Sequence, residues 1–180
     1  MTLFEAENLL IKNNIPYERL EFKNEADFFN HILLFPYTKN LKEEYKVIAL
    51  VIKSNNQKRN IELQFSYIGG NFLFREMFFG GCWAELYNHN EEILPDDILS
   101  RIKDVQSGNL TVIIKNNLKS KKWIYNAVFD TSLEDTYNGK GALLKTIKKI
   151  KSPRGLFSRL LNLRIQYEIY NWNNFESIIK

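Results

Sequence analysis

Two pairs of adjacent glycines, Gly69-Gly70 and Gly80-Gly81, are the part of this chain that most resembles a chemical site. A glycine loop that cradles phosphate needs a helix directly after it, whose free amides and dipole meet the anion. Here both pairs precede stretches rich in aromatic residues, which favour strands, and neither a G-K-[ST] nor a G-x-S-x-G sequence is present. We therefore expect both pairs to be hairpin residues with positive φ.

The residue types that usually carry nucleophilic or metal chemistry are scarce. The chain has one cysteine, Cys82, and two histidines, His31 and His89. Cys82 and His89 lie seven residues apart around a predicted strand end, which does not indicate a thiol–imidazole pair. A zinc site would need more cysteine or histidine ligands than these. We expect no catalytic residue, no metal and no cofactor, and we expect that the chain is not an enzyme.

Paired carboxylates occur in the segment EEILPDD, at Glu91, Glu92, Asp96 and Asp97. Acids at this place fit the solvated first turn of a helix that begins at Pro95, because the helix dipole favours negative charge there. Metal-dependent nucleases carry acids on strands near a lysine, but the spacing of Glu62 and Glu85 does not require a shared site. The EEILPDD acids are therefore candidates for contacts with a partner.

The elements that must position these residues are mostly hairpins and short helices. Thr2 and Glu5 predict a capping box at the start of a first helix. Further helices are predicted over 25–34, 95–106, 141–151 and 153–161, with a last helical turn over 174–180. Strands are predicted over 15–22, 45–53, 60–68, 71–79, 82–88, 110–115, 121–130 and 163–172.

The predicted strands also indicate how the sheet is covered. The run 45–53 is almost wholly apolar, so we expect it inside the sheet with both faces covered. Residues 60–68 alternate, which places Glu62, Gln64 and Ser66 on a polar face. Since hairpins dominate and no regular βαβ alternation occurs, we expect a single α+β domain over 1–180, a mostly antiparallel sheet with helices packed on it.

The strand 71–79 has no polar face. Strict alternation places Phe72, Phe74, Glu76 and Phe78 on one side, and Leu73, Arg75, Met77 and Phe79 on the other. One interpretation is a strand covered on both sides, with Arg75 paired to Glu76 or Glu85. The other is an aromatic surface for a partner, which Arg75, Trp83 and Tyr87 would share, since aromatic residues and arginine dominate binding hot spots.

The net charge of +4 hides a strong asymmetry between the two parts of the chain. Residues 1–100 carry ten Lys and Arg against fifteen Asp and Glu, whereas residues 101–180 carry fifteen against six. The segment 140–164 holds eight basic residues and no acid. Its basic helix fits a solvated face, a contact with nucleic-acid phosphates or docking to an acidic protein. No RRM, KH or helix-turn-helix signature accompanies this charge.

Several features bear on location. The first fourteen residues lack the basic flank and continuous apolar run of a signal peptide, and no window reaches the roughly 18 apolar residues that span a bilayer. A lone cysteine suits a reducing compartment. Abundant Asn, Lys and Ile hint at an AT-rich bacterial genome. We expect a cytoplasmic protein without membrane contact.

In size, layout and composition the whole chain resembles the immunity proteins of bacterial toxin–immunity pairs. The resemblance carries no diagnostic motif, so no residue role is transferred. It implies a non-catalytic protein that binds one toxin domain and blocks its activity. The candidate partner-binding residues are Glu91, Glu92, Asp96, Asp97, Asp130, Glu134, Asp135, Arg75, Trp83 and Tyr87. The basic second half departs from the acidic surface of nuclease inhibitors, and the alternative is a nucleic-acid-binding protein that uses 140–164. The oligomeric state stays open.

Overall fold

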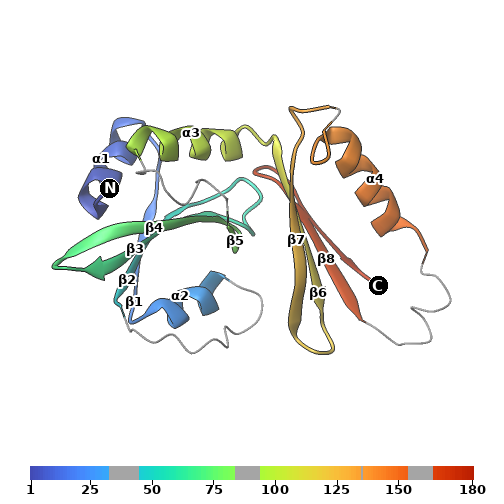
Figure 1. Cartoon of the computed structure of the whole chain (residues 1–180), viewed down its shortest axis with the longest axis horizontal. Coiled ribbons are helices and arrows are strands. Elements are labelled where there is room, and N and C mark those ends of the chain that lie inside the picture. The colour runs from blue at the N-terminus through green and yellow to red at the C-terminus, as the bar shows by residue number, and fades with distance from the viewer. Residues whose placement is uncertain (33–44, 84–93, 135, 154–163) are drawn as a thin grey trace. The chain divides into compact units, whose positions relative to one another are not determined.

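The chain forms two compact units, unit 1 (Met1–Lys103) and unit 2 (Asp104–Lys180), in a computed structural model that describes residues 1–32, 45–83, 94–134, 136–153 and 164–180. Each unit contains an antiparallel sheet with helical cover (Figure 1). The predicted α+β class with mostly antiparallel hairpins is therefore confirmed. The single domain over 1–180 stays a prediction.

Unit 1 is built on a five-stranded sheet with the order β1-β2-β3-β4-β5. Its strands are β1 (Glu18–Phe22), β2 (Val47–Ile52), β3 (Ile61–Ile68), β4 (Asn71–Phe79) and β5 (Cys82–Trp83). Its helices are α1 (Leu3–Lys12), α2 (Glu25–Ile32) and the greater part of α3 (Pro95–Gln106). All six residues of β2 are buried inside the sheet, as its unbroken apolar run predicts.

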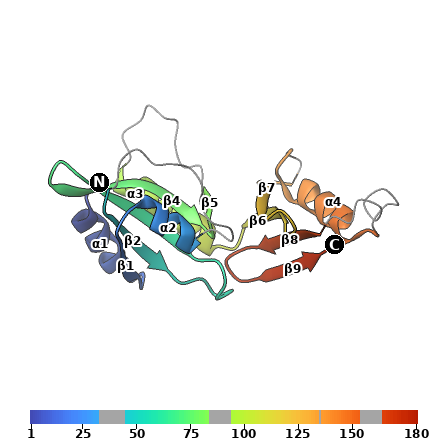
Figure 2. The ribbon, with the colours of Figure 1, turned by 90° about the horizontal axis from the view of Figure 1, so that it is seen from below.

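Helices cover both faces of the unit 1 sheet. α2 lies on one side, and α1 and α3 lie on the other (Figures 1 and 2). Phe28 of α2 is fully buried against Val47, Ala49 and Val51 of β2. Its ring also meets Phe78 of β4 edge-on, with 5.5 Å between the ring centroids. This two-sided cover explains why β2 carries no polar residue.

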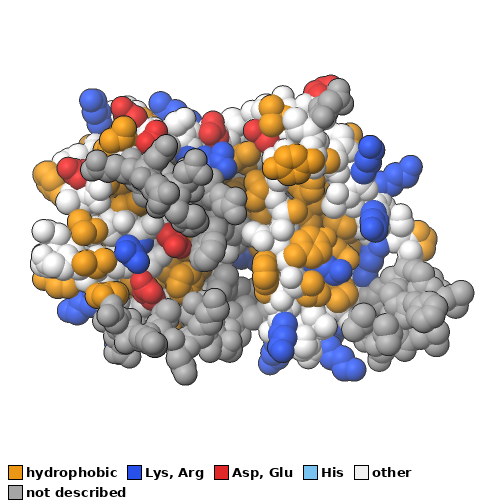
Figure 3. Space-filling model, in the orientation of Figure 1, with side chains coloured by type: hydrophobic (Ala, Val, Ile, Leu, Met, Phe, Trp, Pro, Cys, Tyr) orange, Lys and Arg blue, Asp and Glu red, His pale blue; other side chains and the backbone are white. Residues whose placement is uncertain are grey.

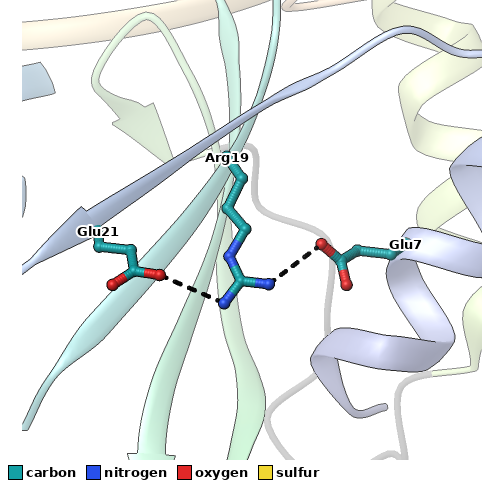
Figure 4. Close-up of polar contacts among 3 residues, drawn as sticks. All are labelled: Glu7, Arg19 and Glu21. Carbon is teal, nitrogen blue, oxygen red and sulfur yellow. Dashed lines mark hydrogen bonds and ion pairs between the residues drawn. The ribbon is translucent and has the colours of Figure 1, made fainter.

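The first helix is fixed at its start and along its side. The Glu5 amide donates to Thr2 Oγ1 at 3.3 Å and the Thr2 amide donates to Glu5 Oε2 at 2.7 Å, which confirms the capping box. Arg19 of β1 then joins strand and helix (Figure 4): its guanidinium lies 3.5 Å from Glu7 Oε1 and 3.3 Å from Glu21 Oε1. α1 is thereby anchored beside the edge strand β1.

The glycine pairs are turn residues, as predicted. Gly69 and Gly70 join β3 to β4 with φ of +59° and +91°, and Gly80 and Gly81 join β4 to β5 with φ of +63° and +79°. Consecutive positive φ values are those of the tight turns that match the twist of a hairpin. The pairs therefore bend the sheet and precede no helix.

A β-bulge divides β4, and it corrects the predicted faces of residues 71–79. Gln64 pairs with Glu76 and Phe65 pairs with Phe74, so Arg75 has no partner across the ladder. Beyond this point the alternation is reversed, because a bulge inserts one extra residue. Phe72 and Phe74 therefore do not share a face with Glu76 and Phe78.

Unit 2 has a four-stranded sheet with the order β7-β6-β8-β9. Its strands are β6 (Leu110–Asn117), β7 (Lys122–Asp130), β8 (Ile165–Tyr170) and β9 (Phe175–Ile179). The helix α4 (Lys140–Lys151) packs Leu143, Ile147 and Ile150 against Ile113 and Ile169 of the sheet. The helix predicted over 153–161 lies outside the described residues, except for Pro153.

The helical turn predicted over 174–180 is wrong, because this segment forms β9. Asn171 Oδ1 accepts hydrogen bonds from the amides of Asn173 at 3.0 Å and Asn174 at 2.8 Å. An asparagine that caps its own turn in this way reverses the chain. The last residues then pair antiparallel with β8, with Tyr170 opposite Phe175.

Candidate functional site

The predicted acidic contacts fall into two separate groups. Asp96 and Asp97 are exposed in the first turn of α3 in unit 1, where Asp97 Oδ2 accepts from the Leu94 amide at 3.2 Å. Asp130 and Glu134 belong to unit 2 and flank the turn after β7. Glu91, Glu92 and Asp135 lie outside the described residues. The described acids therefore do not form one patch within a unit.

The unit 2 acids already have partners within their own unit. Asp130 Oδ1 accepts from the Ser132 amide at 2.9 Å, and Glu134 Oε1 lies 3.4 Å from the ammonium of Lys140. Asp130 is half-buried and shapes its turn, whereas Glu134 is exposed. We expect a partner to meet Asp96 and Asp97 more readily than Asp130.

Of the predicted aromatic and arginine contacts, the structure describes Arg75 in full. Arg75 is exposed at the bulge of β4. Partial burial raises the pKa of the neighbouring Glu76 carboxyl, and the positive charge of Arg75 only partly offsets this rise. The predicted pair with Glu85 lies outside the described residues. So do Tyr87 and the side chain of Trp83, whose backbone pairs with Phe78.

The exposed aromatic surface of unit 1 lies on the part of the β3–β4 hairpin beyond this bulge. Tyr67 of β3 is 45 % exposed and Leu73 of β4 is 36 % exposed. Tyr67 packs on Phe72 across the hairpin with 5.1 Å between the ring centroids. We call Tyr67, Phe72, Leu73 and the neighbouring Arg75 the hairpin surface; Tyr67 and Phe72 share one face of the hairpin, and Leu73, opposite Ser66, points to the other face. Strict alternation placed Tyr67 with the core residues of β3, so sequence reasoning missed its exposure.

The start of the chain fixes the hairpin surface. Thr2 forms an isolated bridge with Leu73, and the Phe74 amide donates to the carbonyl of Met1 at 3.0 Å. Phe4, in the first turn of α1, is 72 % exposed. Figures 1 and 2 show α1 and the tip of the hairpin at the same end of unit 1. Exposed apolar side chains are thus presented on backbone that is already ordered, which lowers the entropy lost on binding.

A second polar feature of unit 1 lies beneath α2 and was not predicted. Glu62, Gln64 and Ser66 of β3 are all buried, although alternation assigned them to a polar face. The Ser66 hydroxyl donates to Glu25 Oε1 of α2 at 3.3 Å. Glu62 is only 6 % exposed, and its Oε2 atom has no hydrogen-bond partner among the residues that the structure describes. The burial of these residues could have been predicted from β2, whose apolar residues on both faces require a cover. The neighbouring strand β3 lies under the same helix, α2.

The environment of Glu62 changes its protonation. Its neighbours across the sheet are Val51 and Phe78, both members of the apolar cluster under α2. Burial raises the pKa of Glu62 from 4.5 to about 8, and the opposing charges of Arg59 and Lys53 only partly offset this effect. The carboxyl is therefore neutral at pH 7 and can donate a proton to a hydrogen bond.

The described residues offer little for metal or small-molecule chemistry. Within the part of the chain that the structure describes, no group of three His, Cys, Asp or Glu residues is placed to hold a metal ion. A shallow hollow of about 530 Å³ lies between the end of α4 and β9, lined by Lys151, Glu176 and Ile178 among others. An ion pair of 3.0 Å joins Lys151 to Glu176 there. Those predicted contact residues that the structure describes do not line this hollow.

Comparison of the chain with known protein families, proteins and structures identifies no relative. No protein-family model, no curated protein and no solved structure matches the chain. None of the helices in the described ranges has the length and apolar character of a membrane-spanning segment. The hairpin surface and the exposed acids of α3 are therefore interpreted from their own geometry.

Proposed function

We propose that the chain is a non-catalytic protein-binding module, an immunity protein that binds and neutralises one cognate bacterial toxin domain in the cytoplasm. The observation that carries this proposal is the exposed, ordered hairpin surface of unit 1. Tyr67, Phe72 and Leu73 offer apolar area there, and Arg75 adds a cation beside them. Such a combination is typical of the few residues that supply most of the energy in a protein interface.

Electrostatic attraction supports the same proposal. Asp96 and Asp97 are exposed in unit 1, and Glu91 and Glu92 add two acids a few residues earlier in the chain. A toxin domain that acts on nucleic acid carries a basic surface, because it must hold phosphates. Opposite charges speed the encounter of such partners and fix their orientation. The acids would therefore guide capture, and the hairpin surface would hold the complex.

The proposal is tested by co-expression with the toxin encoded by the adjacent gene. We expect the chain to restore growth of cells that produce the toxin and to co-elute with it as a stable complex. The variant Asp96→Lys/Asp97→Lys should slow association at least tenfold at low salt, and adding Glu91→Lys and Glu92→Lys should deepen the loss.

A matched control separates contact from overall charge. Glu18→Lys/Glu21→Lys changes the charge of unit 1 by the same amount on exposed positions of β1. We expect this control to retain most of the association rate. Equal loss in both double variants would remove the α3 acids from the interface. Toxicity that the wild-type chain leaves unchanged would contradict the proposed function.

A further inference from the structure

The helix α4 of unit 2 presents a row of exposed lysines on the side opposite its core. Leu143, Ile147 and Ile150 pack on the sheet, and the exposed lysines opposite them are Lys145, Lys148 and Lys149. None of these three has an ion-pair partner among the described residues. By contrast, Lys140 and Lys151 at the two ends of the helix pair with Glu134 and Glu176.

The spacing of these lysines favours an anionic partner. Lys145 lies three residues before Lys148 and four before Lys149, so its side chain is a neighbour of both on the helix surface and is repelled by them. The helix dipole stabilises Lys148 and Lys149 in the last turn but gives Lys145 less help. Figure 3 shows basic side chains gathered along the side of unit 2 where α4 lies. An anion that bridges them would relieve the repulsion.

A fourth cation lies on the same side of the sheet. The Lys115 ammonium of β6 lies 5.6 Å from the ring centroid of Tyr125 and 5.7 Å from that of Tyr167, on the strands to either side. Tyr167 also packs with the residues that α4 covers. The faces of both tyrosine rings stabilise the half-buried ammonium of Lys115. Lys115 therefore adds a positive charge to unit 2 on the face of the sheet that α4 covers.

An exposed aromatic ring precedes the helix that carries these cations. Tyr137 precedes α4 by three residues and is 92 % exposed, so its ring makes little contact with its own unit. Lys145 lies about 9 Å along the helix from the N-cap residue Gly139, given a rise of about 1.5 Å per residue. An exposed aromatic ring at one end of a helix with a row of cations is a combination that can bind an unpaired base by stacking and the phosphates that follow it by charge.

We propose that unit 2 binds single-stranded nucleic acid. Its phosphates would lie along Lys145, Lys148 and Lys149, and one base would stack on Tyr137. A single strand is favoured over a duplex, because the bases of a duplex are already stacked on one another and cannot cover the tyrosine. This activity goes beyond the proposed function, and it involves a different unit from the hairpin surface.

The test is fluorescence anisotropy of the full chain with labelled 15-nucleotide oligo-dT and oligo-rU over a series of salt concentrations. Three phosphate contacts at a slope of roughly 0.7 each predict that log K falls with log salt at a slope of about −2. Lys145→Glu/Lys148→Glu/Lys149→Glu should weaken binding at least tenfold at low salt and flatten the slope. Tyr137→Ala should weaken binding about fivefold or more, whereas Tyr137→Phe should not.

The matched control reverses three exposed lysines of unit 1, as Lys12→Glu/Lys23→Glu/Lys58→Glu, and should change affinity less than threefold. Circular dichroism checks that every variant is folded. Three results would overturn the proposal: no binding to either oligonucleotide, equal losses in the α4 variant and the control, or tighter binding of a duplex of the same length. The proposal would also be overturned, in favour of an acidic protein partner, if polyglutamate displaced the labelled oligonucleotide as well as unlabelled oligonucleotide does.

Discussion

Both units pack helices against antiparallel sheets, yet the surroundings of their ionisable side chains differ. In unit 1, Glu62 lies under α2 between Val51 and Phe78, and burial makes it neutral at pH 7. In unit 2, Lys115 stays half-buried between two tyrosine rings, and the lysines of α4 face solvent. Apolar cover removes the charge of Glu62, whereas the Lys115 ammonium lies over two aromatic ring faces that stabilise a cation.

This difference bears on function. Unit 1 hides its polar row beneath α2 and exposes apolar side chains on the hairpin surface, which suits a protein partner. Unit 2 hides its apolar row beneath α4 and exposes cations, which suits a polyanion. We infer that each unit offers a different kind of surface, and the variants below test the packing that makes this possible.

The largest effect is expected from removing the aromatic ring that holds α2 on unit 1. Phe28 is fully buried and meets Phe22 and Phe78 edge-on. Phe28→Ala should therefore lower the free energy of unfolding by about 3–5 kcal/mol in urea titrations. Phe4→Ala deletes the same ring from an exposed site and should change stability by less than about 0.5 kcal/mol. Similar losses in both variants would show that α2 does not close the core.

The next effect is a dependence of stability on pH that belongs to Glu62. Its folded-state pKa is about 8, above its ordinary value of 4.5. The stabilisation is therefore fully present below pH 4.5 and is lost as the pH rises through 8. Between pH 5 and 9 the free energy of unfolding of the wild-type chain should fall on the order of a few kcal/mol more than that of the Glu62→Gln variant, because glutamine cannot ionise.

Urea titrations at the two pH values measure this difference. Glu18→Gln removes an exposed carboxylate from the edge strand β1, and it should keep the wild-type profile. If Glu62→Gln and the wild-type chain lose equal stability between pH 5 and 9, then Glu62 is ionised in the folded state and the contrast between the two units disappears.

Two glycines at the start of α4 should respond to alanine in opposite directions. A Cβ on Gly139 would lie 2.3 Å from the Leu133 carbonyl oxygen, which is backbone and cannot rotate away. A Cβ on Gly141 would lie an ordinary 3.5 Å from the Glu134 oxygen. Gly139→Ala should therefore lower the free energy of unfolding by about 2–3 kcal/mol. Gly141→Ala should raise it by about 0.5–1 kcal/mol, because alanine has the higher helix propensity. Thermal unfolding of both variants checks the difference in sign, and losses in both would contradict it.

The smallest effect is expected at the exposed ion pairs of Arg19, which join α1 to β1. Arg19→Met should lower stability by less than about 1 kcal/mol, because solvent screens both pairs. The loss should shrink further at 1 M salt, since the Debye length falls to about 3 Å. A loss above 2 kcal/mol that salt does not change would indicate packing by the arginine stem instead.

Local chemistry allowed much of the fold to be predicted. Thr2 and Glu5 indicated the first helix boundary, the apolar run of β2 indicated its place inside the sheet, and the glycine pairs indicated two hairpin turns. Each of these features depends on residues close together in the chain. The exposed acids Asp96 and Asp97 were predicted for the same reason, because a helix start favours them.

The remaining features depend on partners that are distant in the chain. The bulge at Arg75 depends on how β4 is registered against β3, so strict alternation misplaced the faces beyond it. The burial of Glu62 depends on α2, and the exposure of Tyr67 depends on the hairpin extending past the core. The strand β9 was mistaken for a helical turn because its short sequence has no clear period without its partner β8.

Calorimetric titration with the purified toxin domain tests most directly whether the chain binds a protein partner through the hairpin surface. We predict one-to-one binding that weakens at least 100-fold in Tyr67→Ala/Phe72→Ala, two side chains packed together on that surface. Leu144→Ala removes an exposed apolar side chain from unit 2 and should bind like the wild-type chain. Undiminished affinity in the folded double variant would contradict the proposed interface.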